Sequence, residues 1–109
     1  MTDKEIHTTT TATFEGRPIR RYLGVVAAES ARTVAPSNLR TLFSGRAQEA
    51  NAQGLRDGLE SARTNALAEL VARARELGAN AIVRVDVDHA VVNPQIVVVT
   101  ATGTAVVVE

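Results

Sequence analysis

At 109 residues, with twelve basic and twelve acidic side chains that cancel, the chain has the size of one domain and no net charge to attract nucleic acid or an anionic membrane. It contains no cysteine, which excludes disulfides, thiolate zinc sites and cysteine nucleophiles. The residues from Met1 to Thr13 lack the apolar core of a signal peptide, and no apolar run is long enough to span a bilayer. We expect a single domain over residues 1–109, located in the cytoplasm.

The first part of the chain predicts a pair of strands. Residues 8–13 are almost all β-branched and run into Phe14-Glu15-Gly16, which indicates a first strand and a hairpin turn. Apolar or long side chains then recur at every second position from Ile19, which predicts a second strand over residues 19–29. Further on, Ser37 is suited to cap a short helical turn that ends near Phe43.

A long amphipathic helix is predicted from Gln48 to Leu77. Its apolar residues fall three or four positions apart, and charged residues occupy the other face. Gly78 follows as a glycine after a helix end should. The predicted buried stripe consists of Leu55, Leu59, Ala62, Ala66, Leu70, Ala74 and Leu77, widened by Leu67 and Val71.

Two strands are predicted after the helix, joined by a turn at Asn93-Pro94. In the first, residues 80–92, strict alternation predicts that Ala81, Val83, Val85 and Val87 share one face, with Ile82, Arg84, Asp86 and Asp88 on the other. In the second, residues 96–108, both faces are apolar or threonine. The fold class is therefore predicted to be α+β, with two layers: an antiparallel sheet covered by one long helix.

The last strand predicts assembly. An antiparallel sheet of a lone domain normally shows one polar face to water, and a single helix covers only one face. We therefore expect the other face to meet a second subunit, unless the β-branched residues merely reflect strand propensity. The expected interface residues are Ile96, Val97, Val98, Val99, Val106 and Val108. A closed homo-oligomer larger than a dimer would bury them without leaving a reactive edge.

The sequence resembles the YbjQ-like family of uncharacterised bacterial proteins, which carry the label putative heavy-metal-binding. The similarity rests on short segments that occur in the same order: Phe14-Glu15-Gly16, Tyr22-Leu23-Gly24-Val25-Val26 with Glu29, Ala62-Arg63 with Ala66 and Glu69, Ala74, Leu77-Gly78-Ala79-Asn80-Ala81-Ile82-Val83 with Asp86 and Asp88, and Gly103-Thr104-Ala105-Val106.

This resemblance implies a long helix packed on an antiparallel sheet, with subunits closing into a pentameric ring, sometimes paired as a decamer. One segment departs from the family pattern. The family commonly carries Gly-Gly-Arg-Ser and a tyrosine before the long helix, whereas the loop from Gly45 to Leu55 of this chain does not reproduce them.

Three neighbouring residues are the candidate metal ligands: Asp86, Asp88 and His89. The two carboxylates, two positions apart on a strand, point the same way and could share a cation with the imidazole if the chain bends after Asp88. A regular strand instead sends His89 to the opposite face, and soft heavy metals favour thiolates, which this chain lacks. The alternative is that Asp86 pairs with an arginine and that His89 is a surface residue at a strand end.

Arg17, Arg20 and Arg21, around Pro18, could bind a phosphate or an acidic partner, because guanidinium groups suit such oxyanions. The alternative is a solvated edge or an ion pair between subunits. No serine or threonine has a histidine and an acid at a recognisable spacing, and the glycines form no phosphate-binding motif, so no cofactor is expected.

The sequence therefore favours a non-catalytic protein that assembles into a ring or acts as a binding module. The second hypothesis is a metal-binding or metal-sensing protein that uses Asp86, Asp88 and His89. The third is an enzyme with a site composed from two subunits.

Overall fold

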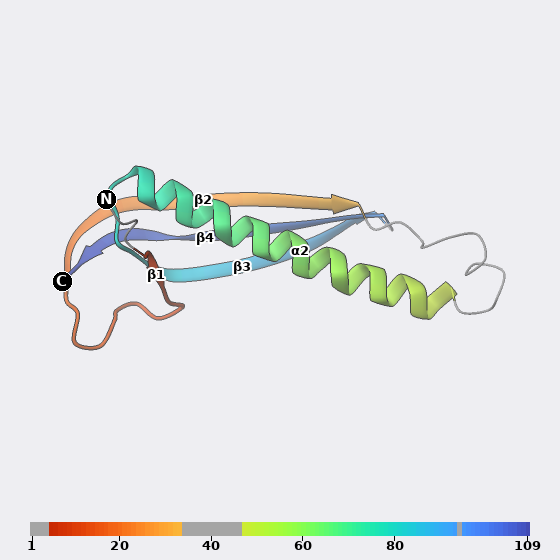
Figure 1. Ribbon diagram of the computed structural model, residues 1–109, viewed down its shortest axis with the longest axis horizontal. Coiled ribbons are helices and arrows are strands. Elements are labelled where there is room, and N and C mark those ends of the chain that lie inside the picture. The colour runs from red at the N-terminus through yellow and green to blue at the C-terminus, as the bar shows by residue number, and fades with distance from the viewer. Residues whose placement is uncertain (1–4, 34–46, 94) are drawn as a thin grey trace.

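The computed structural model describes residues 5–33, 47–93 and 95–109, with the backbone alone described at residues 47–53 and 93. It contains strands β1 (His7–Thr8), β2 (Ile19–Thr33), β3 (Ala81–Asn93) and β4 (Ile96–Val108), and helix α2 (Ala47–Glu76). The helix lies along one face of the sheet, so the predicted α+β class with one covering helix is confirmed (Figure 1). The helical turn predicted between Ser37 and Phe43 lies outside the described residues.

The sheet has four strands in the order β1-β3-β4-β2. Strand β4 pairs antiparallel with both β2 and β3, whereas β1 pairs parallel with β3. The sheet is therefore mixed, which corrects the prediction of a purely antiparallel one.

The predicted first strand over residues 8–13 and its hairpin are also wrong, because β1 ends at Thr8. Beyond it, the hydroxyl of Thr9 accepts a hydrogen bond from the backbone N–H of Thr11 at 3.1 Å, and the two hydroxyl groups lie 2.7 Å apart. Such local side-chain bonds compete with strand formation, even in a β-branched segment. The predicted turn at Gly16 does form, with a φ of 75° at the glycine and a bridge between Phe14 and Arg17.

Helix α2 follows its prediction to within one residue at each end. Its buried stripe consists of residues at a spacing of four, all fully buried: Ala62, Ala66, Leu70 and Ala74. Leu77 is half exposed, because the helix ends before it. The backbone N–H of Gly78 donates to the carbonyl of Arg75 and that of Ala79 to the carbonyl of Ala74, the pairing of a Schellman cap.

Arg73 joins the helix to β2 from the charged side of α2. Its guanidinium donates to the backbone carbonyl of Ala27 at 2.7 Å and to the carboxylate of Glu69 at 2.8 Å. A residue on the polar face of the helix therefore helps to hold the two layers together.

Strand β2 changes its buried face near Gly24. The predicted alternation would place Val25 with Leu23, but Val25 is 79% exposed while Val26 and Ala28 are buried. The pairing with β4 shifts its register between Tyr22 and Gly24, and Gly24 has a φ of 129° that favours glycine. A bulge at this point turns the later residues over, so the prediction of a single alternating face is wrong.

Strand β3 has a second irregularity of the same kind. Its register with β4 shifts between Val83 and Asp86, and Arg84 has a φ of 51°, rare for a residue with a side chain. Ile82 and, beyond the shift, Val85 and Val87 consequently belong to the helix-side core. The prediction that Val83, Val85 and Val87 share one face is therefore wrong.

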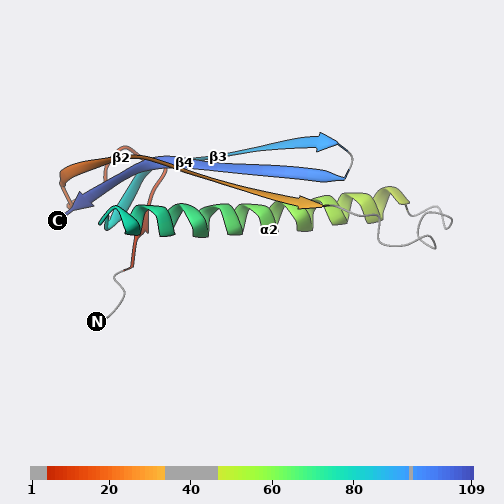
Figure 2. The ribbon, with the colours of Figure 1, turned by 90° about the horizontal axis from the view of Figure 1, so that it is seen from above.

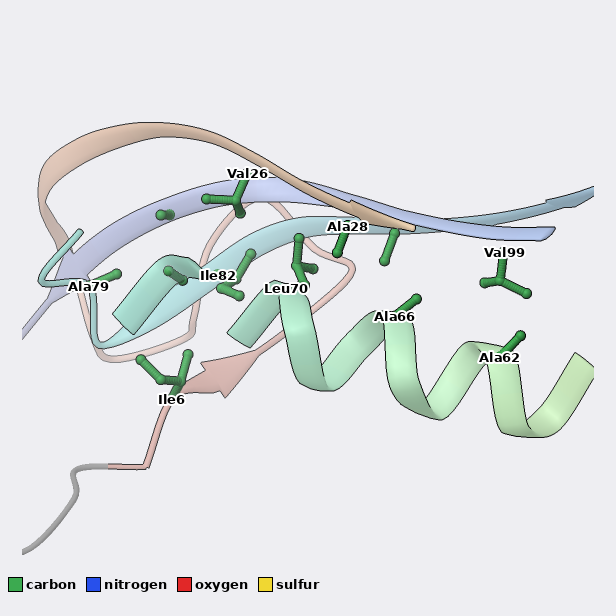
Figure 3. Packing of buried hydrophobic residues seen from close by; sticks show 12 residues of the cluster. Ile6, Val26, Ala28, Ala62, Ala66, Leu70, Ala79, Ile82 and Val99 are labelled. Carbon is green, nitrogen blue, oxygen red and sulfur yellow. The ribbon is translucent and has the colours of Figure 1, made fainter. Parts of the chain in front are cut away.

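Strand β4 has the predicted bounds, and its two faces have different covers. Val99, Ala101 and Ala105 pack under α2 in the main core, where Leu70 and Ala66 point toward the sheet (Figure 3). A second, smaller core on the opposite face contains Ala81, Val83, Val106 and Val108, with the half-buried side chains of Phe14 and Ile19 packed against it. The outer face is thus covered at one end within the subunit, which corrects the expectation that it lacks any internal cover.

The protein is long and thin, with principal extents of 58 × 29 × 21 Å. Its radius of gyration is 17.8 Å, whereas a compact domain of this length has about 13 Å. Helix α2 alone accounts for about 45 Å at ~1.5 Å per residue, and β3 and β4 extend alongside it (Figure 2). A shape of this kind leaves much of the sheet at the surface.

Candidate functional site

The candidate metal ligands lie on β3 beyond its irregularity. Asp86 and Asp88 share a face, and the hydrogen bond with Asp88, followed by the charge of Asp88 and by desolvation, raises the pKa of Asp86 above its ordinary value. His89 instead lines a cleft on the helix side, together with Leu59 and Val99. The structure therefore brings the two carboxylates together and separates the imidazole from them.

A heavy-metal ion does not fit the donors that the described residues of the chain supply. Among the described residues, no group of three or more histidine, cysteine, aspartate or glutamate side chains could hold a metal ion. The whole chain has no cysteine to supply a soft ligand. A metal held by Asp86 and Asp88 would need further ligands from another molecule.

Two of the three candidate anion-binding arginines donate to oxygen atoms of Glu109. Arg17 Nε donates to the Glu109 backbone oxygen at 2.7 Å, and Arg20 donates through Nε and a terminal nitrogen to Glu109 Oε1 at 3.0 and 2.7 Å. Arg21 is exposed and takes no part in this contact. Arg20 thus forms an ion pair with Glu109 within the chain, and such exposed pairs contribute about 0.2–1 kcal/mol to stability.

The six expected interface residues divide into two sets. Val97, Val99, Val106 and Val108 are buried within the subunit, whereas Ile96 and Val98 are half-buried on the outer face of β4. The structure also exposes apolar side chains that the sequence pattern did not single out: Tyr22 at 72%, Val25 at 79%, Val91 at 53% and Val92 at 62%. Gly24 was the available signal for the first two, since glycine inside a strand often marks a bulge.

A cleft of about 210 Å³ opens between α2 and the β3–β4 hairpin. It is lined by Leu59, Arg63, Val87, His89 and Val99. The sequence pattern placed Arg63 on the polar face of the helix and gave no reason to connect it with His89. A second, more open recess of about 460 Å³ lies at the β1 side of α2, lined by Thr8, Thr9, Thr10, Leu67, Val85, Asp86 and Val87.

Comparison with known proteins places these features in a family context. The family described as "Putative heavy-metal-binding" and designated YbjQ matches residues 6–109. A UPF0145 protein of Pseudomonas putida strain GB-1 is 45% identical over 104 residues, covering 89% of this chain and 93% of its own length. A UPF0145 protein of Listeria welshimeri is 38% identical over 108 residues, covering 93% of this chain and 94% of its own.

A solved structure has the same fold. It is a protein of unknown function, assigned to the DUF74 family, from Pediococcus pentosaceus; it is 19% identical, with a TM-score of 0.67, and the match covers 95% of this chain and 98% of that one. At this identity the likeness concerns the fold alone. In the described part of this chain, no helix is long and apolar enough to cross a membrane.

Proposed function

This chain belongs to the YbjQ family, whose description is "Putative heavy-metal-binding", and we propose that it works as a non-catalytic protein that assembles into a closed homo-oligomer. The ring provides binding surfaces between its subunits or on its axis. The number five, or ten if rings pair, rests on the family resemblance alone. A cytoplasmic location is part of the proposal and is supported by the absence of cysteine.

The observation that carries this proposal is the pair of unlike open edges of the sheet. Within the described residues, β2 has a strand neighbour on one side only. Strand β3 pairs with β4 on one side, and on the other side it has only its short pairing with β1. A natural protein seldom leaves long strand edges exposed to water, because they pair with other chains. Contact between two different edges is heterologous, and a heterologous contact repeated around an axis closes a ring.

The exposed apolar side chains lie on these same two strands. Tyr22 and Val25 belong to β2, and Val91 and Val92 belong to the far end of β3. Complete burial of a large apolar side chain contributes roughly 1.5–3 kcal/mol. Their transfer from water into a contact between subunits would therefore favour assembly, and it would add the burial that a thin subunit lacks.

Sedimentation equilibrium at micromolar concentration tests the proposal. We expect a particle of five or ten times the 11.6 kDa mass of one chain. A stable monomer would refute assembly, and a dimer would refute the ring.

Three aspartate variants locate the contact. Val98→Asp on the half-buried outer face should dissociate the particle, whereas Val99→Asp in the helix-side core should unfold the subunit. Thr64→Asp on the exposed face of α2 is the matched control and should change neither property. If Val98→Asp leaves a folded particle of full size, the outer face of β4 takes no part in the contact.

A metal-binding function is the second candidate, and the pairing of Asp86 with Asp88 favours it. Because the described residues supply no group of three ligands, we propose that this function depends on assembly. Calorimetric titration with divalent cations separates the candidates. Tight, stoichiometric binding that is lost in Asp86→Asn would favour the metal function, and loss in His89→Ala as well would extend the site to the imidazole.

A further inference from the structure

The cleft between α2 and the β3–β4 hairpin combines an apolar interior with two nitrogen donors. Leu59, Val87 and Val99 supply aliphatic walls, and Val99 is almost completely buried. Arg63 and His89 reach the same space from the helix and from β3, and both are exposed to solvent. In the view of Figure 1, the helix and the hairpin diverge toward the hairpin end of the molecule.

The two donors have no partner within the described part of the chain. Other arginines of the chain do have partners. Arg73, ten residues farther along the same helix, bonds to a carboxylate and a carbonyl, and Arg20 bonds to Glu109. None of the described residues that line the cleft carries a carboxyl group. The cleft is therefore suited to an anion that brings its own apolar body, because a neutral apolar molecule would leave the donors unused.

We propose that this cleft binds a small aliphatic carboxylate, with Arg63 and His89 holding the carboxylate and Leu59, Val87 and Val99 enclosing the aliphatic tail. A guanidinium matches the two oxygens of a carboxylate in a paired hydrogen bond. An aliphatic cavity of about 150 Å³ accommodates benzene, so a cleft of about 210 Å³ has room for a tail of about six carbons. The site uses neither of the paired carboxylates, although His89 lies on β3, whose open edge the proposed assembly also uses.

Titration with hexanoate tests the proposal, with binding followed through the backbone amide signals of the full chain. Shifts should centre on Leu59, Arg63 and His89. Affinity should rise about fourfold for each methylene from butanoate to hexanoate, since each buried CH₂ has a comparable transfer energy. Hexan-1-ol, which lacks the charge, and acetate, which lacks the tail, should both bind at least tenfold more weakly than hexanoate.

Arg63→Gln should weaken hexanoate binding about tenfold, because it removes the positive charge that pairs with the carboxylate. His89→Leu should weaken binding as well, because it removes the imidazole donor. Arg75→Gln, an exposed arginine of the same helix about 18 Å farther along its axis, is the matched control and should bind normally. Leu59→Phe, at a half-buried position, should fill the cleft and abolish the dependence on tail length.

The result that overturns the proposal is hexan-1-ol binding as tightly as hexanoate, or equal hexanoate affinity in Arg63→Gln and Arg75→Gln. Absence of binding by millimolar hexanoate also overturns it. If that absence comes with a change of sedimentation in Arg63→Gln, the cleft is a contact between copies of the chain. Sedimentation tests the proposed assembly and titration tests the proposed carboxylate site, so each proposal can be refuted without the other.

Discussion

Replacing Gly103 by alanine tests the close contact between β4 and β3. A Cβ atom at Gly103 would lie 2.6 Å from Cγ2 of Ile82 and 3.3 Å from the carbonyl oxygen of Val83, whereas ordinary contacts are 3.4–4 Å. Ile82 is completely buried, so its methyl group must move by about an ångström within a close-packed core. Overpacking of this kind costs about 1–3 kcal/mol.

Urea and thermal unfolding at fixed protein concentration should show this cost, and the melting temperature of Gly103→Ala should fall by roughly 4–20 °C. Ile82→Leu moves the branch of the side chain away from Cβ and so removes the methyl group that clashes. We therefore expect Gly103→Ala to cost at least 1 kcal/mol less in the Ile82→Leu background, as a double-mutant cycle would measure. An equal cost in both backgrounds, or a Gly103→Ala protein as stable as the parent, would refute the reasoning.

Three further changes have expected outcomes. Leu70→Ala should lower the free energy of unfolding in urea by about 2–5 kcal/mol, because the Leu70 side chain is completely buried between α2 and the sheet. A loss below about 1 kcal/mol would mean that the core is misplaced. Arg20→Gln should cost less than about 1 kcal/mol in the same assay, since its ion pair with Glu109 is exposed. The pKa of Asp86 is raised on folding, so the folded protein binds this proton more tightly than the unfolded chain. The free energy of unfolding, measured from pH 3 to pH 7, should therefore contain a stabilising contribution from protonated Asp86 that is lost as the pH rises through the raised pKa. Asp86→Asn should remove this pH dependence and should be more stable than the parent protein at pH 7.

Local patterns in the sequence were sufficient for the helix and for the last strand. The spacing of four along α2 and the glycine after it are both local signals, and the helix bounds follow them within one residue. The bounds of β4 were also predictable, because Asn93-Pro94 and the continuous β-branched run are visible without knowledge of the partner strands.

Alternation alone did not predict which side chains of β2 and β3 are buried. A strict period of two holds only while the strand is regular, and one extra residue reverses every later side chain. Gly24 offered a signal in β2, but Arg84 offered none, because a positive φ is unusual for arginine and depends on its neighbours. In the structure, the backbone N–H of Arg84 donates to the carbonyl of Thr11, a contact 73 positions away in the sequence that no local pattern reveals.

In the candidate site, too, local patterns were predictable from the sequence and tertiary contacts were not. The alternation of β3 predicts both the shared face of Asp86 and Asp88 and the separation of His89 from them. The contact of Arg20 with Glu109 joins residues 89 positions apart, and the cleft brings Arg63 to His89 through the packing of the helix on the sheet. These are tertiary contacts, and sequence spacing carries no information about them.

The irregularities of β2 and β3 lie close to the point where the cover of β4 changes from one face to the other, and together they make the two ends of the sheet different. Gly24 of β2 pairs with Ala105 of β4, and β3 shifts its register just beyond Val83, which pairs with Thr104. Burial along β4 changes phase between Ala105 and Val106. On one side of this line the buried face lies under α2, and on the other it lies under Phe14. A sheet with such a change presents unlike surfaces at its two ends. Heterologous contacts, unlike isologous ones, require different surfaces on the two partners. The irregularities at Gly24 and Arg84, which simple alternation does not predict, would supply such a difference for the ring that we propose.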